Sequence, residues 1–285
     1  MMALEGVAGA VTAITGFEKG SGKTTFLNHA HAIARRTGPV ALFTIGVDGA
    51  QKARDSHLVP PEITVAVGDV VMTTEHFART ASARFEILEA LPGRSALGPL
   101  FVGRTVREGS VTLVGSEHLS VLANLLERVA QEKWAHSVLV DGAVNRLTQI
   151  RALGNVNFAF TARIDRSSLG RAAGRIRNLA ALAQLPCALE NSQQTHRIEG
   201  IVNAERLAAV PSGIKALVIE DFTKVFLEPA ELTRALGRFE FLVCQPLQLL
   251  CFAVTLRDVA RDEFLQMVGP IAAAKVLFNP YEVAC

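Results

Sequence analysis

The chain alternates between short apolar runs and longer segments whose apolar residues recur every three or four positions. Short runs rich in valine and isoleucine are typical of buried strands, and the longer pattern is typical of amphipathic helices. The clearest helix is 119–134, where the leucines at 119, 122, 125 and 126 share one stripe. We expect strands at 7–15, 40–45, 63–67, 70–72, 101–103, 111–114, 137–140, 157–161, 200–203, 216–220, 241–243 and 250–254, and helices at 24–36, 85–91, 119–134, 167–184, 230–236 and 257–267.

Strands that alternate with helices predict an α/β fold, in which a mostly parallel sheet carries helices on both faces. The stretch 60–114 has a different pattern, because turn signals such as Gly68-Asp69 and Glu108-Gly109 separate its short apolar runs. We expect this stretch to be a β-rich insertion that adds antiparallel strands. No internal repeat, linker or low-complexity tract interrupts the chain, so we expect a single domain over 1–285.

The composition excludes several classes of protein. The chain has 29 basic and 27 acidic residues, a net charge of +2, and about half of its residues are apolar. High apolar content and low net charge exclude intrinsic disorder. Four cysteines in 285 residues are too few for a disulfide scaffold, and we expect them to be inert buried thiols. The balanced charge, without a block of lysine and arginine, disfavours a nucleic-acid partner.

Neither apolar segment that resembles a membrane or targeting signal has the expected features. The run 241–256 contains Gln245, Pro246 and Gln248, and it is shorter than the roughly 20 residues that a spanning helix needs. The first 16 residues have no basic region and no typical cleavage site. We therefore expect a cytoplasmic protein with no membrane partner.

The strongest chemical motif lies between the first expected strand and the first expected helix. It has the sequence Gly16-Phe17-Glu18-Lys19-Gly20-Ser21-Gly22-Lys23-Thr24-Thr25. A glycine-rich loop in this context lets backbone N–H groups and a helix N-terminus bind phosphate oxygens. Lys23 would reach the β- and γ-phosphates, and the Thr24 hydroxyl would bind Mg²⁺. The usual first glycine of such a loop falls on Phe17, with Gly16 one residue early, so the start of the loop is longer or differently turned.

A magnesium–nucleotide site also needs a carboxylate after a second strand. Asp141 fits because it follows the apolar run 138–140, and the alternative is that it only caps a turn. Asp48, at another strand tip, would position water or touch the metal, or else only form the Asp48-Gly49 turn. Neither Thr223-Lys224-Val225-Phe226 nor Thr255-Leu256-Arg257-Asp258 completes a guanine-selective motif, which favours ATP over GTP.

These motifs predict a P-loop NTPase three-layer sandwich that binds ATP and Mg²⁺. The catalytic candidates are Lys23, Asp48 and Asp141; the nucleotide-binding candidates are Lys19, Gly20, Ser21, Gly22, Lys23, Thr24 and Thr25; and the metal ligands are Thr24 and Asp141.

Taken in order, four segments resemble a known family: the loop 20–25, the turn 45–49, Thr73-Thr74 and the segment 140–146. The set resembles, over about 10–180, the P-loop accessory proteins of adenosylcobalamin-dependent lysine 5,6-aminomutase and ornithine 4,5-aminomutase, described as reactivating ATPases. The resemblance implies an ATPase that remodels a cobalamin enzyme and exchanges its damaged cofactor. This chain departs from the family's pattern at Ala50, where an acidic residue is expected. It also differs from the wider group of dimeric P-loop ATPases at Glu18, where those proteins carry a signature lysine.

Three functions follow as hypotheses. The first is an ATP-hydrolysing switch or chaperone that acts on a partner protein, with a homodimer or a hetero-oligomer expected. The second is a small-molecule kinase or ATP-dependent synthetase, whose acceptor site would lie in 60–114. The third is a degenerate P-loop protein that binds a partner without nucleotide.

Overall fold

In a computed structural model, the described residues are 2–45, 62–95, 97–116, 118–143, 147–151, 153–188 and 195–280. They form an α/β structure with a mostly parallel main sheet, as predicted. The chain divides into two compact units, Met1–Ala162 with Asn279–Cys285, and Arg163–Phe278. The single domain expected over 1–285 stays a prediction. Within the described residues, no helix has the length and apolar character needed to cross a membrane.

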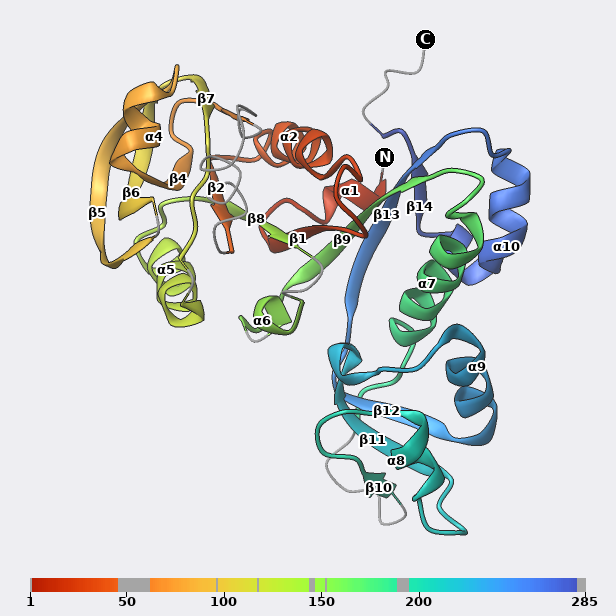
Figure 1. The fold of residues 1–285 in the computed structure, drawn as a ribbon. Coiled ribbons are helices and arrows are strands. Elements are labelled where there is room, and N and C mark those ends of the chain that lie inside the picture. Colours follow the sequence, from red (N-terminus) through yellow and green to blue (C-terminus); the bar gives the residue numbers. More distant parts are fainter. Residues whose placement is uncertain are drawn as a thin grey trace. The chain divides into compact units, whose positions relative to one another are not determined.

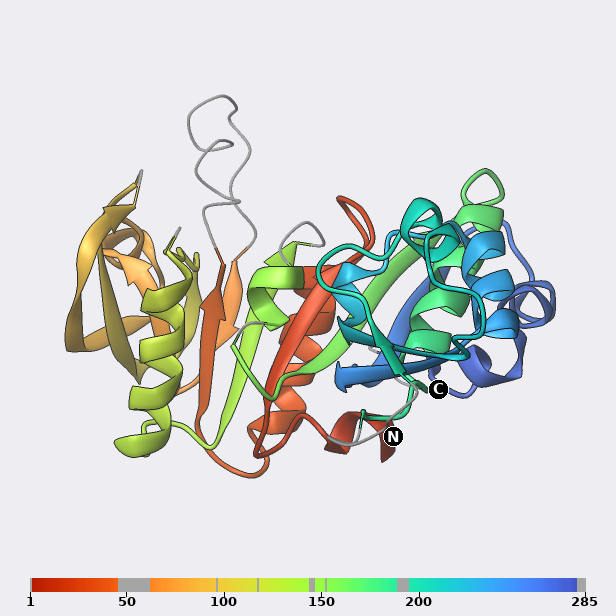
Figure 2. The same cartoon turned by 90° about the horizontal axis from the view of Figure 1, so that it is seen from below.

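The first unit is built on parallel strands in the order β9-β1-β8-β2-β4 (Figures 1 and 2). Every residue of β2 is buried, as expected for a strand covered on both faces. Figure 1 shows α2 on one face of this sheet and α5 and α6 on the other. The bounds are α1 Met2–Glu5, β1 Val11–Gly16, α2 Lys23–Ala34, β2 Val40–Thr44, β4 Val70–Thr74, α5 Leu119–Gln131, β8 Ser137–Ala143, α6 Leu147–Arg151 and β9 Asn157–Ile164, the last of which crosses the boundary between the units.

The antiparallel additions predicted for 60–114 are confirmed. Strand β6 pairs antiparallel with β4 on one side and with β5 on the other, and β3 pairs antiparallel with β7. The helix expected at 85–91 is wrong, because these residues belong to β5. A Cβ at Gly103 would lie 3.1 Å from the Phe85 Cβ, so the glycine lets the two strands approach closely. The bounds are β3 Ile63–Val65, α4 Glu75–Thr80, β5 Arg84–Ser95, β6 Gly98–Arg107 and β7 Gly109–Val111.

A buried carboxylate joins this insertion to helix α2. Asp69 is fully buried, and its carboxylate lies 2.6 Å from the Nε2 of His31 on α2 and 3.0 Å from the Nη1 of Arg35, the C-cap of that helix. It also accepts the backbone N–H groups of Val40 and Ala66. Burial alone would raise the pKa of Asp69, but these hydrogen bonds and the charge of His31 hold it below its ordinary value. The end of α2, the start of β2 and the turn before β4 therefore share one charged anchor.

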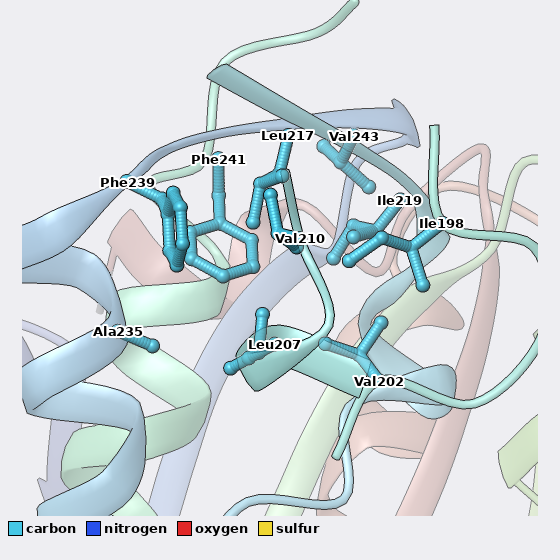
Figure 3. Close-up of a cluster of buried hydrophobic side chains, with 10 residues drawn as sticks. All are labelled: Ile198, Val202, Leu207, Val210, Leu217, Ile219, Ala235, Phe239, Phe241 and Val243. Atoms are coloured by element: carbon cyan, nitrogen blue, oxygen red, sulfur yellow. The ribbon is translucent and has the colours of Figure 1, made fainter. Parts of the chain in front are cut away.

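The second unit contains a three-stranded parallel sheet in the order β10-β11-β12 and a parallel pair of β13 and β14. Figure 3 shows apolar side chains of the three-stranded sheet facing Leu207 of α8 and Ala235 of α9. The segment expected as a strand at 200–203 makes only an isolated bridge, between Val202 and Val225. The bounds are α7 Leu169–Leu182, β10 Thr195–Arg197, α8 Ala204–Ala208, β11 Ala216–Asp221, η2 Phe222–Lys224, α9 Pro229–Arg238, β12 Glu240–Gln245, β13 Gln248–Leu256, α10 Arg261–Ala273 and β14 Val276–Phe278.

Candidate functional site

The predicted strand, loop and helix occur in that order at the start of the first unit. Strand β1 ends at Gly16 and helix α2 begins at Lys23, so the loop between them is 17–22. The strand begins at Val11 rather than at 7, because α1 and a turn occupy the residues before it. Since β1 lies between β8 and β9, the loop leaves the interior of the sheet rather than an edge.

The glycine that the start of the loop requires is Gly16. A Cβ at this position would lie 2.1 Å from the Ser21 Oγ and 3.3 Å from the Glu18 carbonyl oxygen, so a side chain would collide with the loop. Phe17 instead continues the strand, because its N–H donates to the carbonyl of Thr161 over 2.9 Å. Its ring lies 5.9 Å from the ring of Phe160, centroid to centroid. The first glycine of the loop therefore stands at position 16, where β1 ends, and five residues separate it from Gly22.

Two further glycines allow backbone conformations in the loop that other residues rarely adopt. Gly20 has φ 80° and Gly22 has φ 87°, a left-handed conformation that residues with a Cβ adopt only at an energetic cost. Gly22 is the N-cap of α2 and provides no side chain to accept the first helical N–H groups. The amides of Lys23, Thr24 and Thr25 thus begin a helix whose N-terminus is suited to an anion.

Ser21 is anchored on the neighbouring strand β9. Its Oγ lies 2.9 Å from the Oγ1 of Thr161, and both side chains are buried. Its backbone N–H donates to the Glu18 carbonyl over 3.4 Å. The hydroxyl of Ser21 is therefore part of the support of the loop. Thr161 was not among the residues predicted for the site, because no local motif marks a contact between positions 140 residues apart.

Lys23, the first residue of α2, meets Asp141, which lies near the carboxyl end of β8. In the parallel register of β1 and β8, Ile14 lies opposite Asp141. The Nζ of Lys23 lies 2.8 Å from the Oδ1 of Asp141, and the two side chains are 22% and 21% exposed. The main-chain carbonyl of Asp141 accepts the Thr44 hydroxyl, at the end of β2, over 3.1 Å. The structure therefore brings Lys23 and Asp141 together, and their roles in a nucleotide site stay predictions.

The remaining predicted site residues differ in their positions. Thr24 is half-buried in the first turn of α2, whereas Thr25 and Lys19 are exposed. Asp48 and the rest of its turn lie outside the described residues, as do residues 144–146 of the segment after Asp141. The roles assigned to all these residues stay predictions.

The donor set fits a magnesium ion that is held jointly with phosphate. Mg²⁺ prefers oxygen ligands and commonly binds one or two carboxylates together with substrate phosphates. Thr24 and Asp141 offer a hydroxyl and a carboxylate beside the glycine-rich loop. Among the described residues, no group of three or more His, Cys, Asp and Glu side chains is placed to hold a metal ion.

The described cysteines are free thiols, and only part of the expectation for them holds. Cys251 is fully buried, and burial raises the pKa of its thiol to about 12, so it is inert as expected. Cys187 is exposed, which corrects the expectation of a buried thiol at that position. It follows helix α7, where the chain runs along β12 with only a single bridge, to Val243.

The comparisons with known proteins do not assign the site. Protein-family models, curated proteins and solved structures give no match to this chain. The resemblance to the accessory ATPases of cobalamin-dependent aminomutases therefore stays a prediction from short motifs. The functional argument rests on the loop and on the two charged residues beside it.

Proposed function

We propose that this chain is a P-loop ATPase that binds Mg-ATP and acts as a switch on a partner protein. The observation that carries the proposal is the contact of Lys23 with Asp141 beside a loop shaped by three glycines. A cation, an acidic metal ligand and a helix N-terminus at one sheet edge are the components that phosphoryl transfer requires. The fold would accordingly be that of a P-loop NTPase.

Each part of the site has a separate role in the proposal. The backbone N–H groups of Gly20 and of 22–25 bind the phosphates, and Lys23 stabilises the negative charge that develops on the transferred phosphoryl group. Thr24 and Asp141 hold Mg²⁺. When bound, this ion supplies positive charge that offsets the charge of the phosphates. The protein contributes mainly orientation and electrostatics, because phosphoryl transfer needs little covalent participation from side chains.

The contact between Lys23 and Asp141 also offers a switch. Binding of phosphate to Lys23, or of Mg²⁺ to Asp141, would compete with the contact between these two residues. Loss of this contact would alter how the start of α2 is held to β8. The carbonyl of Asp141 is hydrogen-bonded to Thr44, so a change there would extend to the end of β2. A partner that binds this edge would sense the change. A cobalamin-dependent aminomutase is the partner that the motif resemblance suggests.

The Asp141→Asn variant should reduce the dependence of ATP binding on magnesium. Without the carboxylate, Lys23 is free to bind phosphate in the absence of metal, and the metal loses a charged ligand. We expect the ratio of the Kd in EDTA to the Kd in Mg²⁺ to fall about tenfold or more, the size expected for a charge-assisted contact. Titration of a fluorescent ATP analogue in both buffers measures this ratio.

The matched control is Asp262→Asn, which removes an exposed carboxylate from helix α10. This variant should keep the wild-type ratio. A wild-type ratio for Asp141→Asn would show that its carboxylate neither binds the metal nor competes for Lys23.

The proposed activity is tested by the release of inorganic phosphate from ATP by the wild-type chain. We expect release that requires Mg²⁺ and needs no small-molecule acceptor. Release only after a metabolite acceptor is added would favour a kinase or synthetase instead. The absence of release under every condition, together with the absence of nucleotide binding, would contradict the proposal.

A further inference from the structure

We propose that Thr161 is a positioning residue that holds the phosphate loop in its nucleotide-binding conformation. It lies on β9, outside the loop motif, and it would act through Ser21 rather than through contact with nucleotide. This inference rests on the proposed function, because it concerns how the same loop binds phosphate.

Thr161 contacts both ends of the loop. Its carbonyl accepts the N–H of Phe17 over 2.9 Å, which fixes the residue that leaves β1. Its Oγ1 lies 2.9 Å from the Oγ of Ser21, which fixes the side of the loop that returns toward α2. Thr161 is 1% exposed and Ser21 is 3% exposed, so water does not readily replace either partner. One buried residue therefore ties the beginning of the loop to its end.

The Thr161 hydroxyl has a second polar neighbour. Its Oγ1 lies 3.5 Å from the carbonyl oxygen of Thr15, which is longer than an ordinary O–H···O hydrogen bond. Either hydroxyl can be the donor in the shorter contact between Thr161 and Ser21. Valine at position 161 would remove this contact and leave the Ser21 hydroxyl buried without its partner on β9. Serine would keep a hydroxyl at this position.

The loop needs this support because glycines surround Ser21. Gly20 and Gly22 flank it, and glycine has more accessible backbone conformations than any other residue. Gly16 also leaves room for the Ser21 hydroxyl, since a Cβ there would lie 2.1 Å from its Oγ and 3.2 Å from the Oγ1 of Thr161. Without the contact, the loop would have to be ordered when phosphate binds, and the lost conformational entropy would weaken binding.

The test compares three variants for their Kd for Mg-ATP, measured by titration calorimetry, and for their melting temperature. Thr161→Val should raise the Kd about tenfold, as expected when a buried hydrogen bond is broken. Thr161→Ser should restore the Kd to within about twofold of wild type. The matched control is Thr12→Val on β1, whose buried hydroxyl has no hydrogen-bond partner among the described residues, and whose Kd should not change.

A second variant keeps the proposal testable if Thr161→Val does not fold. Ser21→Ala should weaken Mg-ATP binding in the same direction, and the double variant should lose little more, because both changes remove one contact. A lower melting temperature with an unchanged Kd in Thr161→Val or Ser21→Ala would assign a purely structural role to the contact and overturn the proposal. A wild-type chain that fails to bind Mg-ATP would instead contradict the function on which it rests.

Discussion

The Lys23→Ala variant should release phosphate from ATP about a hundredfold more slowly than the wild-type chain, or not at all. The Nζ of Lys23 lies 2.8 Å from the carboxylate of Asp141, the metal ligand of the proposed site, and Lys23 begins the helix whose N-terminus faces the phosphates in that site. Removing one preorganised charge donor from such a site typically lowers the rate by two to three orders of magnitude. A coupled colorimetric phosphate assay at saturating Mg-ATP measures the change.

Lys215→Ala is the matched control for this experiment. Lys215 is an exposed lysine in the second unit, and its removal changes the net charge by the same amount. Its rate should equal that of the wild type. Equal rates for Lys23→Ala and the wild type would contradict the assignment of the loop as the site of hydrolysis.

The Asp69→Ala variant should lose about 3 to 5 kcal/mol of unfolding free energy, the cost typical of breaking a buried charged network. The substitution removes the acceptor of His31, Arg35 and two backbone N–H groups at once. It also leaves the buried side chain of His31 without this partner. Urea unfolding followed by circular dichroism measures the loss, with Asp262→Ala as a control at an exposed aspartate that should change little.

The contribution of Asp69 to the free energy of unfolding should also depend on pH. Because the pKa of Asp69 in the folded chain lies below its ordinary value of 3.8, its charged form contributes stability fully above that pH. The contribution disappears as the pH falls through the lower folded pKa. The difference in unfolding free energy between the wild type and Asp69→Ala should therefore be constant near neutrality and shrink in strong acid. A difference that stays constant into strong acid would show that the charge of Asp69 does not matter.

The strand, glycine-rich loop and helix were predictable because their signals are local. A strand, a glycine-rich turn and a helix follow one another within 11–34, and each has a recognisable pattern. The meeting of Lys23 with Asp141 was expected because both residues were assigned to one nucleotide site, an assignment that stays a prediction. The structure places Asp141 opposite Ile14 of β1 and 2.8 Å from the Nζ of Lys23.

The contact of Thr161 with the loop and the anchor at Asp69 could not be predicted, because each joins residues that lie far apart in the sequence. Thr161 lies 140 positions from Ser21, and Asp69 lies 38 positions from His31, with no shared motif. Gly68-Asp69 was recognised only as a turn.

Strand β5 shows where local preference misleads. Residues 85–91 have a helix-like composition, yet they pair with β6 across a register that contains bulges. Pairing with a neighbouring strand outweighs the weak helix preference of a short segment such as this one. The close approach at Gly103, which allows this pairing, lies in a different apolar run.

Titration calorimetry of the wild-type chain with Mg-ATP tests the central claim most directly. The account predicts saturable binding of one nucleotide per chain, lost in Lys23→Ala and kept in Lys215→Ala. At about 100 times the measured Kd, the same ligand should raise the free energy of unfolding by about 2.7 kcal/mol. A wild-type chain that shows neither heat of binding nor stabilisation by Mg-ATP would contradict the account.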